Sequence, residues 1–142
     1  MATVLKKADL THRLLARFID FLIGAAFCLV LYPVGVLMGA TYIAIADGLF
    51  GGQSLGKRII GLRVVRTGDG GPITFKDSLI RNSMYAVIYL FYLIPYLRWV
   101  LIPTIGLVIV AFEVYYLVVD VNGFRVGDLA ADTQVIDDPA LK

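Results

Sequence analysis

The sequence predicts an all-α integral membrane protein: a single domain over residues 1–142 with four transmembrane helices. Three observations lead to this fold class. Of the 142 residues, 59% are hydrophobic, a larger share than soluble domains carry. Residues 21–46 contain no Asp, Glu, Lys, Arg or His, which is typical of membrane-crossing segments. Basic residues gather at the N-terminus and in residues 51–82, and such clusters are expected in the cytoplasm.

The long apolar stretch near the N-terminus is predicted to form two spans, over residues 14–31 and 34–50. A single helix over residues 14–50 would be about 55 Å long, whereas the hydrocarbon core of a bilayer is about 30 Å thick. Pro33 and Gly35 interrupt the stretch near its middle. Two crossings also place both basic clusters on the same side. Asp47, near the end of the second span, is expected to be an interfacial acid.

Residues 51–77 are predicted to form a cytoplasmic loop that carries a small β-hairpin. Ser54 is expected to cap a short helix over residues 55–60. Residues 62–66 have the composition of a strand, and the turn signal over residues 69–72 is followed by Ile73. Four basic side chains of this loop are expected to face anionic lipid or a partner protein: Lys57, Arg58, Arg63 and Arg66.

The second half of the chain is predicted to contain spans over residues 78–97 and 100–119. Thr74 and Asp77 have the spacing of a capping box, so a helix should begin there. Residues 95–103 are expected to form the outer turn. The acidic tail over residues 120–142 then returns to the cytoplasm, where it is expected to dock on the basic loop.

Three tyrosines form an aromatic face on the third predicted span, at helical spacings of four and three residues: Tyr85, Tyr89 and Tyr92. We expect this face to pack against neighbouring helices.

Together the four spans predict a multi-pass protein of the plasma membrane with both termini in the cytoplasm.

Two carboxylates, Asp20 and Glu113, lie within predicted spans, where ionisable groups are rare and mark ion pathways or contacts between helices. Arg13 and Asp20 are two turns apart on one helical face, and Arg17 precedes Asp20 by three residues. Asp20 has two interpretations: a local ion pair that fixes the helix start, or a carboxylate that faces a polar cavity. For Glu113 a hydrogen bond to a tyrosine hydroxyl is slightly favoured over ion binding.

Three segments resemble the RDD family of small bacterial membrane proteins: residues 13–20, residues 52–82 and residues 128–135. The resemblance implies that the arginine and the two aspartates that name the family are Arg13, Asp20 and Asp128. Together with Arg17, these three residues are expected to interact with one another through their charges. Gly127 stands where a histidine often precedes the second aspartate, so a histidine-based proton relay is not expected.

Two functions fit these residues. The first is exchange of a monovalent cation for a proton, with Asp20 and Glu113 as the binding groups. A carboxylate in surroundings of low dielectric constant can bind either a proton or a cation, so the two compete for it. The alternative is a non-catalytic membrane module or accessory subunit that binds a partner protein or anionic lipid. A homo-oligomer or a larger membrane complex is expected, since four helices enclose only a thin pathway.

Enzymatic activity, cofactors, metal ions and nucleic acid are not expected. His12 and Cys28 are the only residues of their kinds, so neither a histidine cluster nor a cysteine-based metal site is available. The segment from Gly51 to Lys57 resembles a phosphate-binding loop, but Arg58 stands where the motif needs Ser or Thr.

Overall fold

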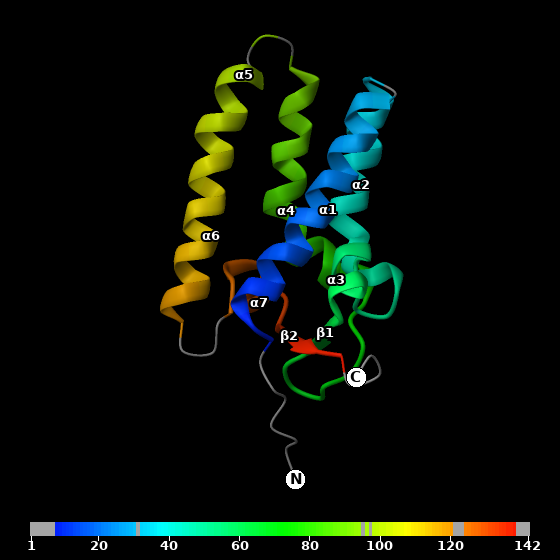
Figure 1. Cartoon of the computed structure of the whole chain (residues 1–142), viewed down its shortest axis with the longest axis vertical. Coiled ribbons are helices and arrows are strands. Elements are labelled where there is room, and N and C mark those ends of the chain that lie inside the picture. Colours follow the sequence, from blue (N-terminus) through cyan, green and yellow to red (C-terminus); the bar gives the residue numbers. More distant parts are fainter. Residues whose placement is uncertain (1–7, 31, 95, 97, 121–123, 139–142) are drawn as a thin grey trace.

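The computed structural model describes residues 8–138, apart from residues 31, 95, 97 and 121–123. Long helices lie side by side along the long axis of the molecule, and short elements gather at one end of them (Figure 1). The long helices are α1 (Leu10–Val30), α2 (Val34–Leu49), α4 (Phe75–Leu90), and a continuous helix made of α5 (Arg98–Leu101), a π-helical turn (Ile102–Gly106) and α6 (Leu107–Val119).

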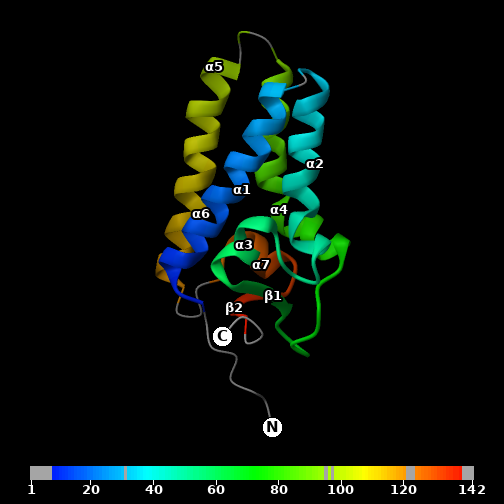
Figure 2. The ribbon, with the colours of Figure 1, turned by 45° about the vertical axis from the view of Figure 1, so that its right-hand side comes forward.

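The short elements form a unit that we name the cap. It consists of α3 (Leu55–Ile60), β1 (Leu62–Arg66), α7 (Val126–Ala130) and β2 (Thr133–Asp137). Figure 2 shows α3, α7 and the two strands packed together below α1, α2 and α4. Segments from the middle and from the end of the chain therefore meet in the cap.

Local signals in the sequence account for where several elements begin. The Thr74 hydroxyl accepts a hydrogen bond from the Asp77 N–H, and the Asp77 carboxylate accepts one from the Thr74 N–H, which completes the predicted capping box of α4. Ser54 caps α3 by accepting from the Lys57 N–H at 3.3 Å. Gly61 ends α3 in the left-handed region, with a φ of 82°.

The predicted β-hairpin within residues 51–77 is wrong, although its first strand is present. β1 pairs antiparallel with β2 of the tail, with Val64 opposite Val135. On the far side of the expected turn, Pro72 makes only an isolated antiparallel bridge with Val65. Pro72 has no N–H with which to continue a ladder, and Thr74 already caps α4. The tail does reach the basic loop, through this sheet.

Two hydrophobic cores hold the molecule together. One lies in the cap and is formed by Ala8, Ala16, Leu62, Val64, Ile73 and Val135. The other lies among the helices and is formed by Ala40, Ile43, Tyr85 and Tyr89. Rings of the predicted tyrosine face pack there: Phe21 contacts Tyr85 edge-on at 5.3 Å between centroids.

Among the described residues, one helix is long and apolar enough to cross a bilayer on its own, the 22-residue helix Arg98–Val119. It corresponds to the predicted span over residues 100–119. Of the other predicted spans, α2 has 16 residues, and α4 ends at Leu90 before a short 3₁₀ turn, Phe91–Leu93. Part of the predicted outer turn, Pro95 and Leu97, lies outside the described residues.

Candidate functional site

Nine charged side chains are buried where the long helices meet the cap, among the residues that the structure describes. We name this set the charge network. Its members come from α1, α2, α3, α4, α6 and the segment that forms α7: Arg13, Arg17, Asp20, Asp47, Lys57, Arg81, Glu113, Arg125 and Asp128. Charged groups are rarely buried unless they are paired, so each partner is informative.

Asp128 is the centre of the charge network. Its carboxylate lies 2.8 Å from the Arg13 guanidinium, 2.6 Å from that of Arg81 and 3.2 Å from that of Arg125. Burial opposes ionisation of this carboxyl group, but the three guanidinium groups outweigh burial and hold the pKa of Asp128 below its usual value. Asp128 therefore joins α1 and α4 to the tail of the chain through charged hydrogen bonds.

Backbone packing holds Asp128 in place. The Asp128 carboxylate also accepts from the Arg125 backbone N–H at 3.3 Å, which fixes the start of α7. Gly127 lies directly against the backbone carbonyl of Arg81, where a Cβ atom would collide with it. A glycine at this position thus lets α7 approach α4 closely enough for Arg81 to reach Asp128.

Asp47 forms a second centre. The Lys57 ammonium group pairs with one oxygen of its carboxylate. The other oxygen accepts a hydrogen bond from the Asn82 side chain at 3.1 Å and lies 3.4 Å from the Arg81 guanidinium. Arg81 thereby links Asp47 to Asp128. Asp47, expected to be an interfacial acid, is fully buried within the protein.

Lys57 is also placed differently from the prediction. It was expected to face lipid or a partner, but only 3% of it is exposed, since it turns inward to Asp47. Burial lowers the pKa of Lys57 to about 7, against the opposing attraction of Asp47. The other predicted residues of this group are at least partly exposed. Arg63 pairs with Asp138 at 3.0 Å, Arg66 lies near Asp69 and Asp77, and Arg58 stacks on Phe50.

Asp20 is held entirely by hydrogen bonds. Its carboxylate accepts from the Tyr42 hydroxyl at 2.9 Å, from the Ser54 hydroxyl at 2.5 Å and from the Gly56 N–H at 2.9 Å. No cation lies within 4 Å of it in the described part of the chain, so the local ion pair with Arg17 does not form. Gly56 packs on the Ala16 carbonyl, leaving no room for a side chain. Asp20 therefore fastens the start of α3 to α1.

Arg17 lies apart from the carboxylates. Its guanidinium donates to the Asn82 side-chain oxygen at 3.0 Å and lies 4.9 Å from the centre of the Tyr85 ring. Within the described residues it has no carboxylate partner within 4 Å. Asn82 thus contacts both Arg17 and Asp47, which connects this cation to the rest of the charge network.

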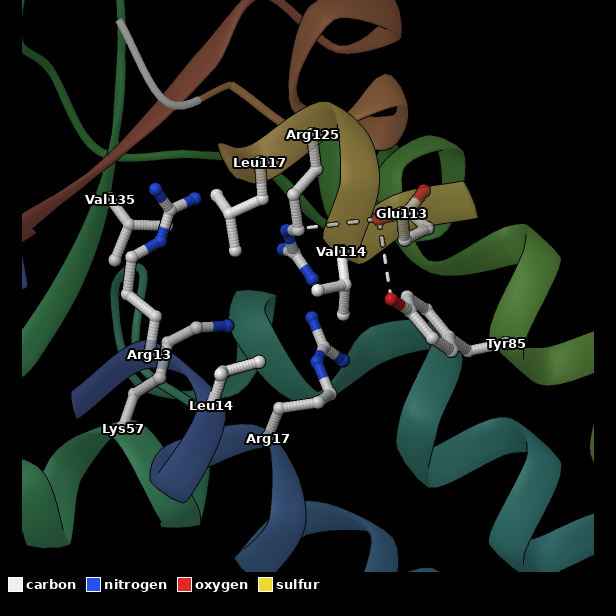
Figure 3. A pocket seen from close by; sticks show the side chains of 10 residues that line it. All are labelled: Arg13, Leu14, Arg17, Lys57, Tyr85, Glu113, Val114, Leu117, Arg125 and Val135. Carbon is white, nitrogen blue, oxygen red and sulfur yellow. Dashed lines mark hydrogen bonds and ion pairs between the residues drawn. The ribbon is translucent and has the colours of Figure 1, made fainter. Parts of the chain in front are cut away.

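Glu113 is the member from α6. One of its oxygens accepts from the Tyr85 hydroxyl at 3.2 Å, as the favoured interpretation expected, and lies 4.0 Å from the Arg125 guanidinium. The other oxygen, Oε1, is buried and has no hydrogen-bond partner among the described residues. Figure 3 shows Glu113, Tyr85 and Arg125 at one side of a small cavity that Arg13, Arg17 and Lys57 also line.

Sequence reasoning named about half of the charge network. The resemblance supplied Arg13, Asp20 and Asp128, and helical spacing to Asp20 supplied Arg17. Arg13 and Asp128 form an ion pair that joins α1 to the tail. Arg81, Asn82 and Arg125 were missed as site residues. The signal that could have found Arg81 is its position within a predicted membrane span, where a charged group needs a partner. In the described part of the chain, no group of three or more His, Cys, Asp and Glu could hold a metal ion.

Comparison with known proteins gives one match. The sequence model of the RDD family matches residues 25–132, which is more than half of the chain. No curated protein and no solved structure matches it. The match includes Asp47, Lys57, Arg81, Glu113, Arg125 and Asp128 of the charge network, and Arg13, Arg17 and Asp20 precede it.

Proposed function

The chain belongs to the RDD family and is a membrane protein, and from this premise we propose that it is a non-catalytic membrane module whose cap binds anionic lipid. The observation that carries the proposal is that three buried aspartates already have partners within the protein. Asp20, Asp47 and Asp128 are each occupied by donors from other elements of the same chain. These hydrogen bonds and ion pairs hold the cap on the helices, so none of the three carboxylates is free to bind a cation.

The surface of α3 supports lipid as the ligand. Arg58 is exposed and has no carboxylate within 4 Å in the described part of the chain, while its neighbour Ile59 is 70% exposed. Phe50 and Leu55 are also exposed on this side of the cap. A short segment that combines a cation with exposed apolar side chains is suited to the interface of an anionic leaflet.

The proposal includes four membrane crossings with both termini in the cytoplasm. Leu22, Leu29, Leu37 and Val87 are exposed on α1, α2 and α4, as side chains in contact with lipid should be. Cysteines placed at Thr67 and Tyr96 in a Cys28→Ala background should react with an impermeant reagent from opposite sides. Labelling of both from the same side contradicts this topology.

Lipid binding is tested with a fluorophore on α3. Ile59→Cys in the Cys28→Ala background carries an environment-sensitive dye, and the protein is placed in nanodiscs of phosphatidylcholine with or without phosphatidylglycerol. The dye emission should shift to the blue when the anionic lipid is present, and Arg58→Ala should reduce the shift. A dye on Thr67→Cys, in the exposed loop after β1, is the matched control. An Ile59 dye that stays in water in both lipids refutes the proposal.

The second candidate function is exchange of a monovalent cation for a proton, and Glu113 favours it. Its unpartnered oxygen is buried beside a cavity, where a carboxylate is free to take up a proton. Dye-reported proton movement in proteoliposomes after a Na⁺ or K⁺ step is the test. Under this function Glu113→Gln abolishes the signal and Asp20→Asn reduces it, whereas the membrane-module function predicts no ion-dependent signal in the wild type. Assembly into a homo-oligomer or a larger complex stays a prediction.

A further inference from the structure

The cavity beside the charge network has a mostly cationic lining. Its volume is about 30 Å³. The polar side chains that line it are Arg13, Arg17, Lys57, Tyr85, Glu113 and Arg125. Figure 3 shows the cationic ends of Arg17, Arg125 and Lys57 turned toward the same space, with Glu113 and Tyr85 at its edge. Three positive groups thus converge on a cavity that one carboxylate borders, and Arg13 lines the cavity without pointing at the same space.

The charges of the described network do not balance. Five of its members are basic and four are acidic. Arg13, Arg81 and Arg125 share Asp128, and Lys57 pairs with Asp47, so Arg17 is the cation left without a carboxylate. A buried charge that lacks compensation is costly, because protein surroundings solvate it less well than water does. An anion in the cavity would supply the missing negative charge.

A second observation concerns Glu113. The residue is 2% exposed, and its Oε1 atom has no hydrogen-bond donor within the described part of the chain. An unsatisfied buried acceptor costs about 1–3 kcal/mol in general, so such atoms usually have a bound partner. In Figure 3 the Glu113 oxygen that carries the dashed lines is the one turned toward the cations, so a donor on Oε1 would lie outside the space between them. The occupant of the cavity itself needs only to present negative charge to Arg17.

We propose that the cavity is a binding site for one small inorganic anion, held by Arg17, Lys57 and Arg125. About 10–15 Å³ suffices for one water, so the cavity has room for about two. Two occupants fit this volume: a bicarbonate ion, or a chloride ion with one water beside it. A phospholipid headgroup is too large for the cavity, so this site is separate from the proposed lipid surface on α3.

The binding energetics involve Lys57 as well. Burial lowers the pKa of Lys57 to about 7, so near neutral pH this group is only partly protonated without an anion. The groups around it are Asp47 of α2, Asp20 and Arg17 of α1, and Arg81 of α4. A bound anion favours the charged ammonium form, so the protein should take up protons when the anion binds.

The test uses the full chain, purified in a neutral detergent at pH 7.5 and constant ionic strength. Sodium gluconate, whose anion is too large for the cavity, is replaced stepwise by chloride, nitrate or bicarbonate, and the melting temperature is recorded. A saturable rise of roughly 5–10 °C is expected at an anion concentration about 100 times its Kd. A rise with any of the three anions supports the proposal and identifies which anion the cavity accepts. If every anion acts like gluconate, the proposal is overturned.

Arg17 variants place the effect in the cavity. Arg17→Met removes the unpaired cation and should abolish the anion-dependent rise, whereas Arg17→Lys, which keeps the charge, should retain it with a weaker affinity. Arg98→Met is the matched control, because Arg98 lies on α5 at the opposite end of the helices (Figure 1). If Arg17→Met does not fold, the affinity of the Arg17→Lys protein for the anion is measured by isothermal titration calorimetry and compared with that of the wild type. An unchanged affinity in either Arg17 variant overturns the assignment.

Discussion

The junction between the helices and the cap differs from the outward face of α5 and α6 in how it is held. At the junction, buried charges from six segments of the chain contact one another, and glycines let backbones touch. On the outward face, α5 and α6 show mostly exposed apolar side chains, such as Val108 and Val118, which are 66% and 61% exposed. Figure 1 shows that α6 runs beside the other helices down to the level of the cap. The junction depends on specific partners, whereas the outward face depends on its apolar surroundings.

This difference has a physical basis. Lipid tails satisfy an apolar side chain as well as another protein side chain does, so a lipid-facing helix needs no particular partner. A buried aspartate needs donors at defined positions and loses several kcal/mol without them. We therefore expect substitutions among the buried charges at the junction to destabilise the protein far more than those on the exposed face of α6.

The largest effect is expected at Asp128. Asp128→Ala leaves the guanidinium groups of Arg13, Arg81 and Arg125 without their shared carboxylate. Breaking a buried ion pair by removing one partner costs about 3–5 kcal/mol, so this variant should express poorly or melt far below the wild type. A melting curve in detergent measures the loss. Asp132→Asn, which removes an exposed charge in the same tail and tolerates the positive φ of 48° at this position, should have little effect.

Arg13→Ala should be milder, because Asp128 keeps Arg81 and Arg125. The double variant Arg13→Ala/Asp128→Ala should then be more stable than the sum of the two single losses predicts. Additive losses would mean that the 2.8 Å ion pair contributes nothing by itself.

A smaller effect is expected from the close backbone contact at Gly127. Gly127→Ala places a Cβ atom against the Arg81 carbonyl, which forces α7 away from α4. Overpacking of this kind costs about 1–3 kcal/mol. Gly68→Ala is the control, because nothing lies within 4 Å of the position of its added Cβ. Equal melting temperatures of the two variants would show that the junction between cap and helices yields easily.

The sequence predicted what depends on neighbouring residues. The capping box at Thr74, the cap at Ser54 and the strand over residues 62–66 are all local signals, and the structure has them. The partner of that strand was predicted wrongly, since β2 lies about 70 residues away and no local pattern pairs the two strands.

The charge network shows the same limit. Asp47, Lys57 and Arg81 were each visible as charged residues, but their mutual contact depends on how α2, α3 and α4 pack. A single sequence does not fix such a contact. The pairing of Arg13 with Asp128 was anticipated only through the resemblance to the RDD family, since these residues are 115 positions apart.

The pH dependence of stability should reveal the buried lysine. Burial lowers the pKa of Lys57 from 10.5 to about 7, so between these values the unfolded chain binds the proton that the folded protein releases. The contribution of Lys57 to the free energy of unfolding therefore rises with pH between about 7 and 10.5, by at most about 1.4 kcal/mol per pH unit. Chemical unfolding at several pH values measures the slope. Lys57→Met should flatten it, and an identical slope in that variant would place Lys57 in a more solvated site.

The smallest effect is expected on the exposed face of α6. Val118→Ala removes two methyl groups from a side chain that touches little of the protein, and its cost should stay within about 0.5 kcal/mol. Leu117→Ala, one residue earlier and 6% exposed, should cost about 2–4 kcal/mol, because it leaves a cavity beside the charge network. Melting curves of both variants in the same detergent compare the two faces of one helix. A large loss from Val118→Ala would mean that another protein surface, rather than lipid, covers this face. The contrast between the junction and the outward face of α6 would then hold only for the isolated chain.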